Sequence, residues 1–210
     1  MLRLSIISAA TFFLLACGNS TSDNASKQML PIIGEKKTGG ADNKDTIYHT
    51  IEPFSFVNQY NEIIDDKTTA NKIYVADFFF ATCQSICPQM SSQLVNVQKA
   101  FEKDNDLLIL SHTVNPMHDT VEVLKGYADS YGAIKNKWHF LTGDKKAIYS
   151  LAKNSYLINA LEDDGSVEGF LHSELFLLID KQKRIRGMYD GTDSVAVGQL
   201  ISDIKSLKQE

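Results

Sequence analysis

Three apolar runs recur along the middle of the chain, and each has the length of one strand. Residues 73–80 (IYVADFFF) and 107–114 (LLILSHTV) are apolar almost throughout, which is typical of strands buried on both faces of a sheet. A third and shorter run covers residues 138–141, and weak alternation at 53–57 indicates a further candidate strand. This pattern predicts a buried central sheet.

Helical spacing separates these predicted strands. Pro88 suits the first turn of a helix, and a helical apolar series follows it at Met90, Leu94, Val97 and Phe101. Asp119 is predicted to cap a second helix, with Glu122 three residues on in a capping-box arrangement. A third helix is predicted to begin at Asp144.

The C-terminal part follows a different order. Residues 175–179 and 185–189 have the pattern of an antiparallel hairpin around 180–183. A closing helix carries one apolar side, formed by Leu200, Ile201, Ile204 and Leu207. Alternating strands and helices followed by a hairpin predict an α/β fold of the thioredoxin-like type, with a central mixed sheet, helices on both faces and a C-terminal β-hairpin plus helix.

The first residues have the features of a secretory signal. Arg3 precedes an apolar run over residues 4–16, and small residues follow at its end. The run is shorter than the roughly 20 residues that span a bilayer. Cys17 at its end resembles the cysteine of a bacterial lipobox, which is acylated after cleavage; a plain secretory signal with a chance cysteine is the alternative. We therefore predict a lipoprotein signal peptide at 1–16 and lipidation of Cys17.

The next segment, residues 17–45, is rich in Ser, Asn, Asp, Lys, Gly and Thr and is predicted to be a flexible tether. An apolar island at 29–33 interrupts it and is a candidate to pack on the domain, which is predicted to span 46–210. With 43% hydrophobic and 22% charged residues, the composition is that of a globular protein. The net charge of −5 and the absence of a basic block argue against nucleic acid as a partner.

The two cysteines that remain, Cys83 and Cys87, lie where a central strand is predicted to end and a helix to begin. A disulfide across so small a loop would hardly stabilise the fold, so their role is predicted to be chemical. Cys87, just before Pro88, is the predicted helix cap, where backbone N–H groups favour anionic sulfur. Thiolates serve both disulfide exchange and metal binding. The spacing differs from the C-x-x-C of thioredoxin-type redox enzymes, and two soft thiolates favour Cu(I).

A metal held by two thiolates needs at least one more donor, and His172 is the candidate. It lies just before the strand predicted at 175–179, and in a thioredoxin-like sheet the loop entering that strand lies beside the cysteine loop. A structural or merely exposed histidine is the alternative. Met117 and His118 form a soft pair that could accept copper transiently, although an ordinary exposed loop is the favoured interpretation. The remaining histidines show no paired spacing: His49, His112 and His139.

Ordered motifs from residue 54 to the last helix resemble those of the Sco/SenC proteins. The motifs are SFVNQ at 55–59, DFFF at 77–80 with Cys83, Cys87 and Pro88, VNP at 114–116 with Asp119-Thr120 and VLK at 123–125, Trp138 with FLTG at 140–143, His172-Ser173 with LID at 178–180, and Tyr189 with Gly191. A cysteine pair alone would be a weak signal, whereas this ordered set is specific.

The resemblance implies a thioredoxin-fold copper metallochaperone rather than an enzyme, with Cys83, Cys87 and His172 as the metal ligands. It implies binding of Cu(I), with Cu(II) as a further state, and a redox-active disulfide between Cys83 and Cys87 on oxidation. The implied partner is the copper-bearing subunit of cytochrome c oxidase or a similar client. Together with Cys17, it implies a domain on the periplasmic side of a bacterial membrane, anchored by lipid.

Two departures from the family pattern and three alternative functions stay open. Asn115 stands where the family usually has Asp, which puts in doubt any role of that carboxylate in charge balance or docking. Lipid is predicted where many relatives use a transmembrane helix. The rival is a thiol–disulfide oxidoreductase that reduces client cysteines, for which His172 would be dispensable. A peroxidase interpretation rests only on Thr82 beside Cys83, and redox or copper sensing is a third alternative.

Overall fold

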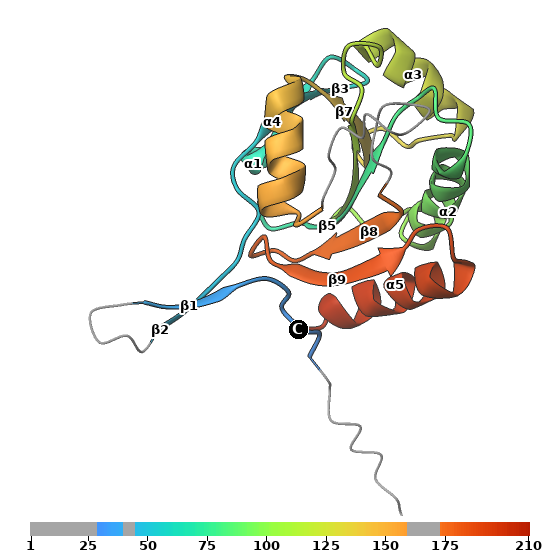
Figure 1. Ribbon diagram of the computed structural model, residues 1–210. Coiled ribbons are helices and arrows are strands. Elements are labelled where there is room, and N and C mark those ends of the chain that lie inside the picture. Colours follow the sequence, from blue (N-terminus) through green and yellow to red (C-terminus); the bar gives the residue numbers. More distant parts are fainter. Residues whose placement is uncertain (1–28, 40–44, 159–172) are drawn as a thin grey trace, which may run out of the picture.

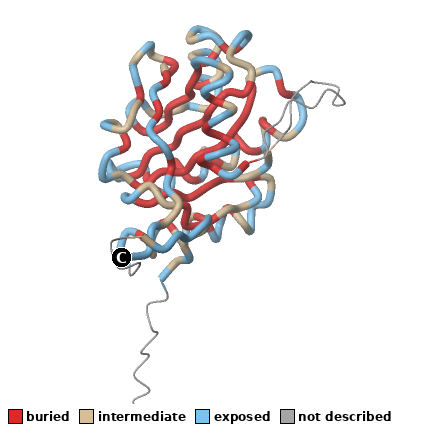
Figure 2. The backbone as a smooth tube through the Cα atoms, turned by 60° about the vertical axis from the view of Figure 1, so that its left-hand side comes forward, coloured by how far each residue is buried: buried red, intermediate tan, exposed pale blue. Residues whose placement is uncertain are grey.

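The apolar runs in the middle of the chain form the parallel core of a sheet. The computed structural model describes residues 29–39, 45–158 and 173–210 (Figure 1). Every residue of the core strands is buried, as Figure 2 shows in red. These parallel-paired strands are β5 (Ile73–Phe79), β6 (Leu107–Thr113) and β7 (Trp138–Thr142). The prediction of strands buried on both faces is confirmed.

Antiparallel strands extend this core on both sides. Beside β5 lie β8 (Leu175–Ile179) and β9 (Ile185–Asp190), and beside β7 lie β3 (Ser55–Asn58) and β4 (Ile63–Asp65). Within the described residues, seven strands form one sheet in the order β4-β3-β7-β6-β5-β8-β9. The predicted α/β class, mixed sheet and C-terminal hairpin are therefore confirmed, while the short edge strand β4 was not predicted.

Helices cover both faces of the sheet (Figure 1). One face carries α2 (Ile86–Ala100), α3 (Val121–Ser130) and α5 (Ser194–Leu207). The other carries α4 (Lys145–Ser150), which continues as the π-helix η1 (Leu151–Ser155). Right-handed crossovers between adjacent parallel strands place α2 and α3 on the same face. The single turn α1 (Asp66–Thr69) follows β4 and is capped by Asp65.

Side chains of β5 alternate between these two layers, as the period of a strand requires. Phe79 packs toward α3, where its ring centroid lies 5.1 Å from that of Tyr127. Phe78 packs on the opposite face, 5.5 Å from the ring of Tyr156 at the end of η1. The loop that leaves β5 is therefore anchored by a strand that is packed on both sides.

Ordered structure extends into the segment predicted as a tether. β1 (Lys36–Gly39) and β2 (Asp45–Tyr48) pair as an antiparallel hairpin across the predicted boundary at residue 45. Their residues are mostly exposed and polar, so they carry little of the apolar signal by which strands are recognised.

The apolar island at 29–33 packs on the domain, as predicted. Ile33 donates its N–H to the carbonyl of Ile185 in β9 at 2.8 Å. Arg186 donates to the carbonyls of Leu30 at 2.6 Å and Pro31 at 2.9 Å. The predicted signal peptide and Cys17 lie outside the described residues.

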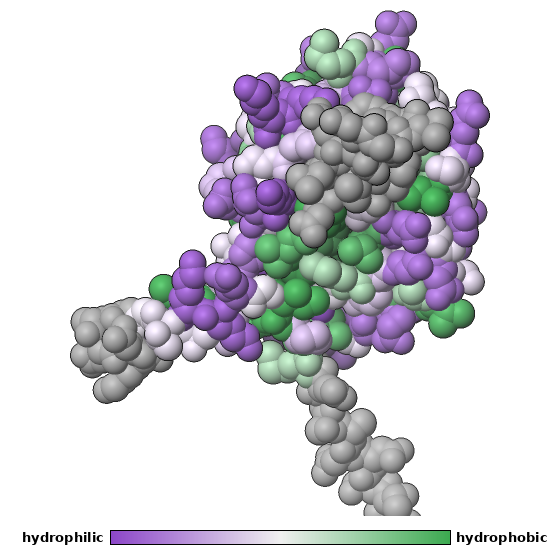
Figure 3. All heavy atoms as spheres, in the orientation of Figure 1, coloured by the Kyte–Doolittle hydropathy of each residue, from purple (hydrophilic) through white to green (hydrophobic). Residues whose placement is uncertain are grey.

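The surface is mixed in character. Figure 3 shows hydrophilic residues around the outline of one face and hydrophobic residues gathered toward its centre. In the described parts of the chain, no helix combines the length and the apolar character needed to cross a membrane.

Candidate metal centre at the end of β5

Cys83 and Cys87 come together at the carboxyl end of β5. Cys83 lies in the loop after the strand, with its N–H donating to the carbonyl of Phe80 at 3.2 Å. Cys87 is the second residue of α2. The helix begins earlier than predicted, because its N-cap is Ser85 and not Cys87. The prediction of a cysteine pair between a central strand and a helix is confirmed.

The helix start directs hydrogen bonds at the Cys83 sulfur. The backbone N–H of Cys87 donates to Cys83 Sγ at 3.4 Å, and the Ser85 hydroxyl lies 3.5 Å from the same sulfur. The Ser85 side chain makes no capping hydrogen bond to the helix backbone. Both cysteines are free thiols and are buried, with 5% of Cys83 and 2% of Cys87 exposed.

The two thiols have opposite acidities. Burial raises the pKa of Cys83, but hydrogen bonds from Cys87 and Ser85 outweigh burial and bring the pKa below its ordinary value. Burial also raises the pKa of Cys87, and its hydrogen bond with Cys83 raises it further, so Cys87 stays protonated far above neutral pH. Cys83 is therefore the thiol that ionises first.

A buried carboxyl group lies beneath the pair on the same face of β5. Asp77 accepts a hydrogen bond from the Ser111 hydroxyl at 2.5 Å, and Ser111 accepts one from Trp138 Nε1 at 2.9 Å. Burial raises the pKa of Asp77 to about 7, although the Ser111 hydrogen bond opposes this. The charge of Asp77, when it forms, contributes to the raised pKa of Cys87.

A second buried carboxylate fixes the cysteine loop from the loop that follows the neighbouring strand β6. Asp119 is fully buried and accepts hydrogen bonds from the Ala81 N–H at 3.1 Å and from the Thr113 hydroxyl. It also accepts one from His118 Nδ1 at 2.9 Å. The prediction that Asp119 caps α3 is wrong, because the N-cap is Thr120, whose hydroxyl accepts from the N–H of Val123. Sequence reasoning thus missed the tie between Asp119 and the loop.

The remaining candidates are placed as follows. His172 lies outside the described residues, and Cys17 does too. Among the residues that are described, no group of three His, Cys, Asp or Glu side chains could hold a metal ion. His49 bonds to the carbonyl of Ser155 at 2.7 Å and His139 to the amide of Asn58 at 3.1 Å, which are structural contacts.

The comparison with known families assigns nearly the whole domain. The SCO1/SenC family model matches residues 42–209. The SCO1 protein homolog of Bacillus subtilis (strain 168) is 30% identical over 170 residues, which cover 80% of this chain and 88% of that protein.

Solved structures show the same similarity. A SCO1/SenC family lipoprotein from Bacillus anthracis str. Ames is 30% identical with a TM-score of 0.69, covering 76% of this chain and 95% of that one. BsSco, described as a member of the Sco family of cytochrome c oxidase assembly proteins with a disulfide switch, is 30% identical with a TM-score of 0.67 over 78% and 96%. ScoI of Bradyrhizobium japonicum with copper bound shares the fold, at 23% identity and a TM-score of 0.62 over 75% and 99%.

Proposed function

Because the chain belongs to the SCO1/SenC family, we propose that it carries copper to the copper-bearing subunit of cytochrome c oxidase or a similar client. The proposed ligands are Cys83, Cys87 and His172. The observation that carries the proposal is the pair of free thiols at the start of α2, with a helix N–H directed at one sulfur. Two thiolates suit Cu(I), and the imidazole would allow Cu(II) as a further state.

The sheet register supports His172 as the third ligand. β8 runs antiparallel to β5, with Ala76 opposite Leu177 and Tyr74 opposite Ile179. The start of β8 therefore lies at the same end of the sheet as the cysteine loop. Since residue 172 precedes β8 closely in sequence, its imidazole would need little chain to reach the two sulfurs.

Copper would move by ligand exchange without a change in its charge. The thiols of Cys83 and Cys87 lose their protons to solvent as their sulfurs bind the ion. Incoming thiols or imidazoles of the client then replace these ligands one at a time. Because protons compete for both sulfurs, copper affinity should fall as the pH is lowered. Oxidation of the two sulfurs to a disulfide by an external two-electron oxidant would remove two ligands and release the ion.

Competition titration of the reduced, full-length protein with Cu(I) held by a chromophoric chelator tests this proposal. Cys83→Ser and Cys87→Ser should each abolish tight binding. His172→Ala should weaken it about tenfold or more, which corresponds to about 1.4 kcal/mol. His49→Ala, which removes an imidazole elsewhere, is the matched control. No uptake by the reduced wild type, or unchanged affinity in His172→Ala, would overturn the ligand assignment.

The asymmetry of the two thiols favours a second candidate function, reduction of client disulfides. The Cys83 thiolate would attack a client disulfide to form a mixed disulfide and release one client thiolate. Cys87 would then displace the second client sulfur, leaving a Cys83–Cys87 disulfide and a client with two thiols. An external dithiol would have to reduce the protein again. This activity would survive His172→Ala and be lost in Cys83→Ser.

We further propose that Cys17 carries the lipid that holds the domain at the outer side of a bacterial membrane. The proposal rests on the apolar run that ends at this cysteine, and it agrees with the description of the Bacillus anthracis relative as a lipoprotein. Labelling of cells with a radioactive or clickable fatty acid tests it. Label should enter the wild type and be absent from Cys17→Ser, and equal labelling of both would refute the assignment.

A further inference from the structure

The turn between β6 and α3 has a fixed backbone. The carbonyl of Asn115 accepts hydrogen bonds from the N–H of His118 at 3.1 Å and from the N–H of Asp119 at 2.9 Å. The N–H of Asn115 in turn donates to the Thr113 hydroxyl at 3.0 Å. The turn therefore holds Met117 and His118 on a preformed backbone at the surface.

The His118 ring is oriented by a buried carboxylate. Its Nδ1 donates to Asp119 Oδ1 at 2.9 Å, and half of the His118 side chain is exposed while that of Asp119 is fully buried. With the proton on Nδ1, Nε2 carries a free lone pair, and no described residue bonds to it. A carboxylate that fixes the tautomer and orientation of an imidazole is the arrangement found behind histidines that bind metals.

The adjacent residue supplies a soft donor. Met117 is 85% exposed, the highest exposure among the large hydrophobic residues described. An exposed methionine contributes no hydrophobic stabilisation to the fold, but its thioether is a ligand suited to Cu(I). Neighbouring residues of one turn thus carry an imidazole nitrogen and a thioether, and two such donors would hold Cu(I) less tightly than two thiolates and an imidazole.

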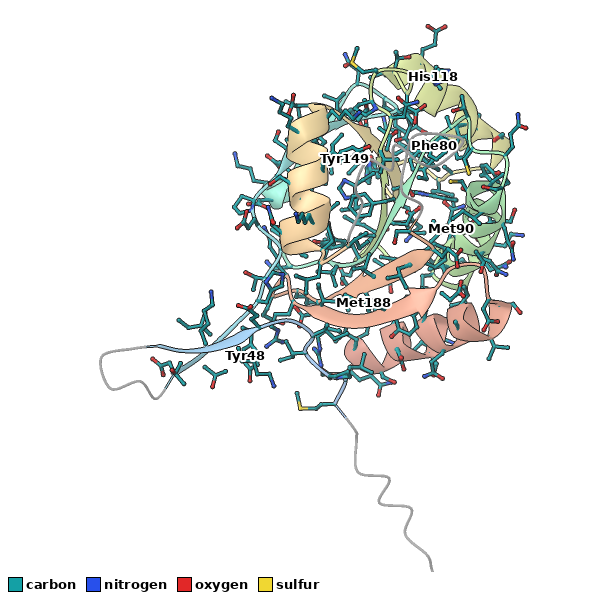
Figure 4. The ribbon with its side chains drawn as sticks, viewed as in Figure 1. Tyr48, Phe80, Met90, His118, Tyr149 and Met188 are labelled. Carbon is teal, nitrogen blue, oxygen red and sulfur yellow. The ribbon has the colours of Figure 1, made fainter. Side chains whose placement is uncertain are left out.

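This turn is linked to the cysteine loop through the same carboxylate. The second oxygen of Asp119 accepts the N–H of Ala81, which precedes Cys83 by two positions. The N–H of Val114 donates to the carbonyl of Phe79 at 2.8 Å, so the two loops leave neighbouring strands at the same end of the sheet. Figure 4 labels His118 and Phe80 at this end.

We propose that Met117 and His118 form a second, solvent-facing Cu(I) site that receives the ion before it reaches the buried cysteines. This inference rests on the proposed copper-carrying function. Copper would bind first to the exposed donors and then pass by ligand exchange to Cys83 and Cys87, whose protons go to solvent. Because both cysteines are nearly inaccessible to solvent, an exposed entry site would raise the rate of loading without changing the final affinity.

The first experiment isolates the proposed site from the cysteine site. The full-length Cys83→Ser/Cys87→Ser/His172→Ala variant is titrated with Cu(I) held by bicinchoninate. It should retain one weakly bound ion, and adding Met117→Leu/His118→Asn should weaken that binding at least tenfold. Asn keeps a donor close to the position of Nδ1, so Asp119 retains its partner. Added Met29→Leu/His49→Asn, which removes the same donor types elsewhere, should leave the binding unchanged.

The second experiment measures loading of the intact cysteine site. Reduced wild type and Met117→Leu/His118→Asn are mixed with the same Cu(I) complex in a stopped-flow instrument. The variant should bind the same final amount of copper, with uptake slowed several-fold. Equal uptake rates, together with no copper on the Cys83→Ser/Cys87→Ser/His172→Ala variant, would overturn the second site while leaving the proposed function intact. Absence of copper from the reduced wild type would instead refute the proposed function.

Discussion

Replacing Asp77 by Asn should change how the stability of the fold depends on pH. The Asp77 carboxyl group lies in β5 between packed layers, with 2% of the residue exposed. Among the described residues, the one that donates a hydrogen bond to it is Ser111, whose hydroxyl lies at 2.5 Å. Burial penalises its charged form more than one hydrogen bond compensates, and this raises its pKa to about 7. Asn has a similar shape and cannot ionise.

The size of the effect follows from the two pKa values. In the unfolded chain Asp77 releases its proton near its ordinary value of 3.8, whereas the folded protein retains the proton until about 7. Below the lower value both states are protonated and nothing is lost. As the pH rises between the two values, the folded state binds more protons than the unfolded state, so the free energy of unfolding falls. The complete loss is on the order of 4 kcal/mol, because each pKa unit is worth about 1.4 kcal/mol.

Urea unfolding followed by tryptophan fluorescence measures this loss. Trp138 is the single tryptophan of the chain and is fully buried, and its Nε1 donates to the same Ser111 hydroxyl at 2.9 Å. With the cysteines kept reduced, the difference in stability between wild type and Asp77→Asn should shift by about 3 kcal/mol in favour of the variant between about pH 4.5 and about pH 8. Asp129→Asn, at an exposed carboxyl group of α3, should show no comparable shift.

The comparison separates ionisation from packing. A constant difference between wild type and Asp77→Asn across the whole pH range would mean that the substitution only disturbs the Ser111 hydrogen bond. Parallel pH profiles of that kind would refute the argument that burial holds the proton on Asp77.

Two further substitutions test buried polar groups away from the cysteines. Arg186→Met leaves Asp180 and Glu210 without their buried partner at 3.1 and 2.6 Å and should lower the free energy of unfolding by about 3–5 kcal/mol, against about 1 kcal/mol for the more exposed Arg184→Met. Equal losses in urea titration would contradict this. His112 has no described partner on either ring nitrogen, and burial lowers its pKa from 6.5 to about 3, so stability is lost as the pH falls through that window. His112→Phe should shift the acid-unfolding midpoint to lower pH, and an unchanged midpoint would count against it.

The central strands could be predicted because a strand that is buried on both faces consists mostly of apolar residues. All residues of β5, β6 and β7 are buried, and each strand is a nearly continuous apolar run. The edge strand β4 has three residues, of which only Ile64 is buried, and β1 and β2 have no buried residue. These short strands form because they pair with a neighbouring strand. The sequence of each one alone contains too few apolar residues to predict a strand or its partner.

The contacts beneath the cysteines could not be predicted for a related reason. The chain from Asp77 to Ser111 and Trp138 joins three strands that are remote in sequence. The sequence did contain one signal. Asp77 is the only carboxyl group inside the apolar run at 73–80, so it must be buried and its pKa must be shifted. For Asp119, its position next to Thr120 at the start of a helix predicted a cap, and only the fold shows its partners across the sheet.

The opposite acidities of the two thiols set an order for copper binding under the proposed function. Cys83, with its lowered pKa, supplies the first thiolate, whereas Cys87 holds its proton until the charge of the ion displaces it. Copper binding at neutral pH should therefore release the Cys87 proton with each ion bound. Calorimetry of Cu(I) transfer in buffers of different ionisation enthalpy counts that proton. Identical heats in all buffers would mean that Cys87 was already ionised or does not bind.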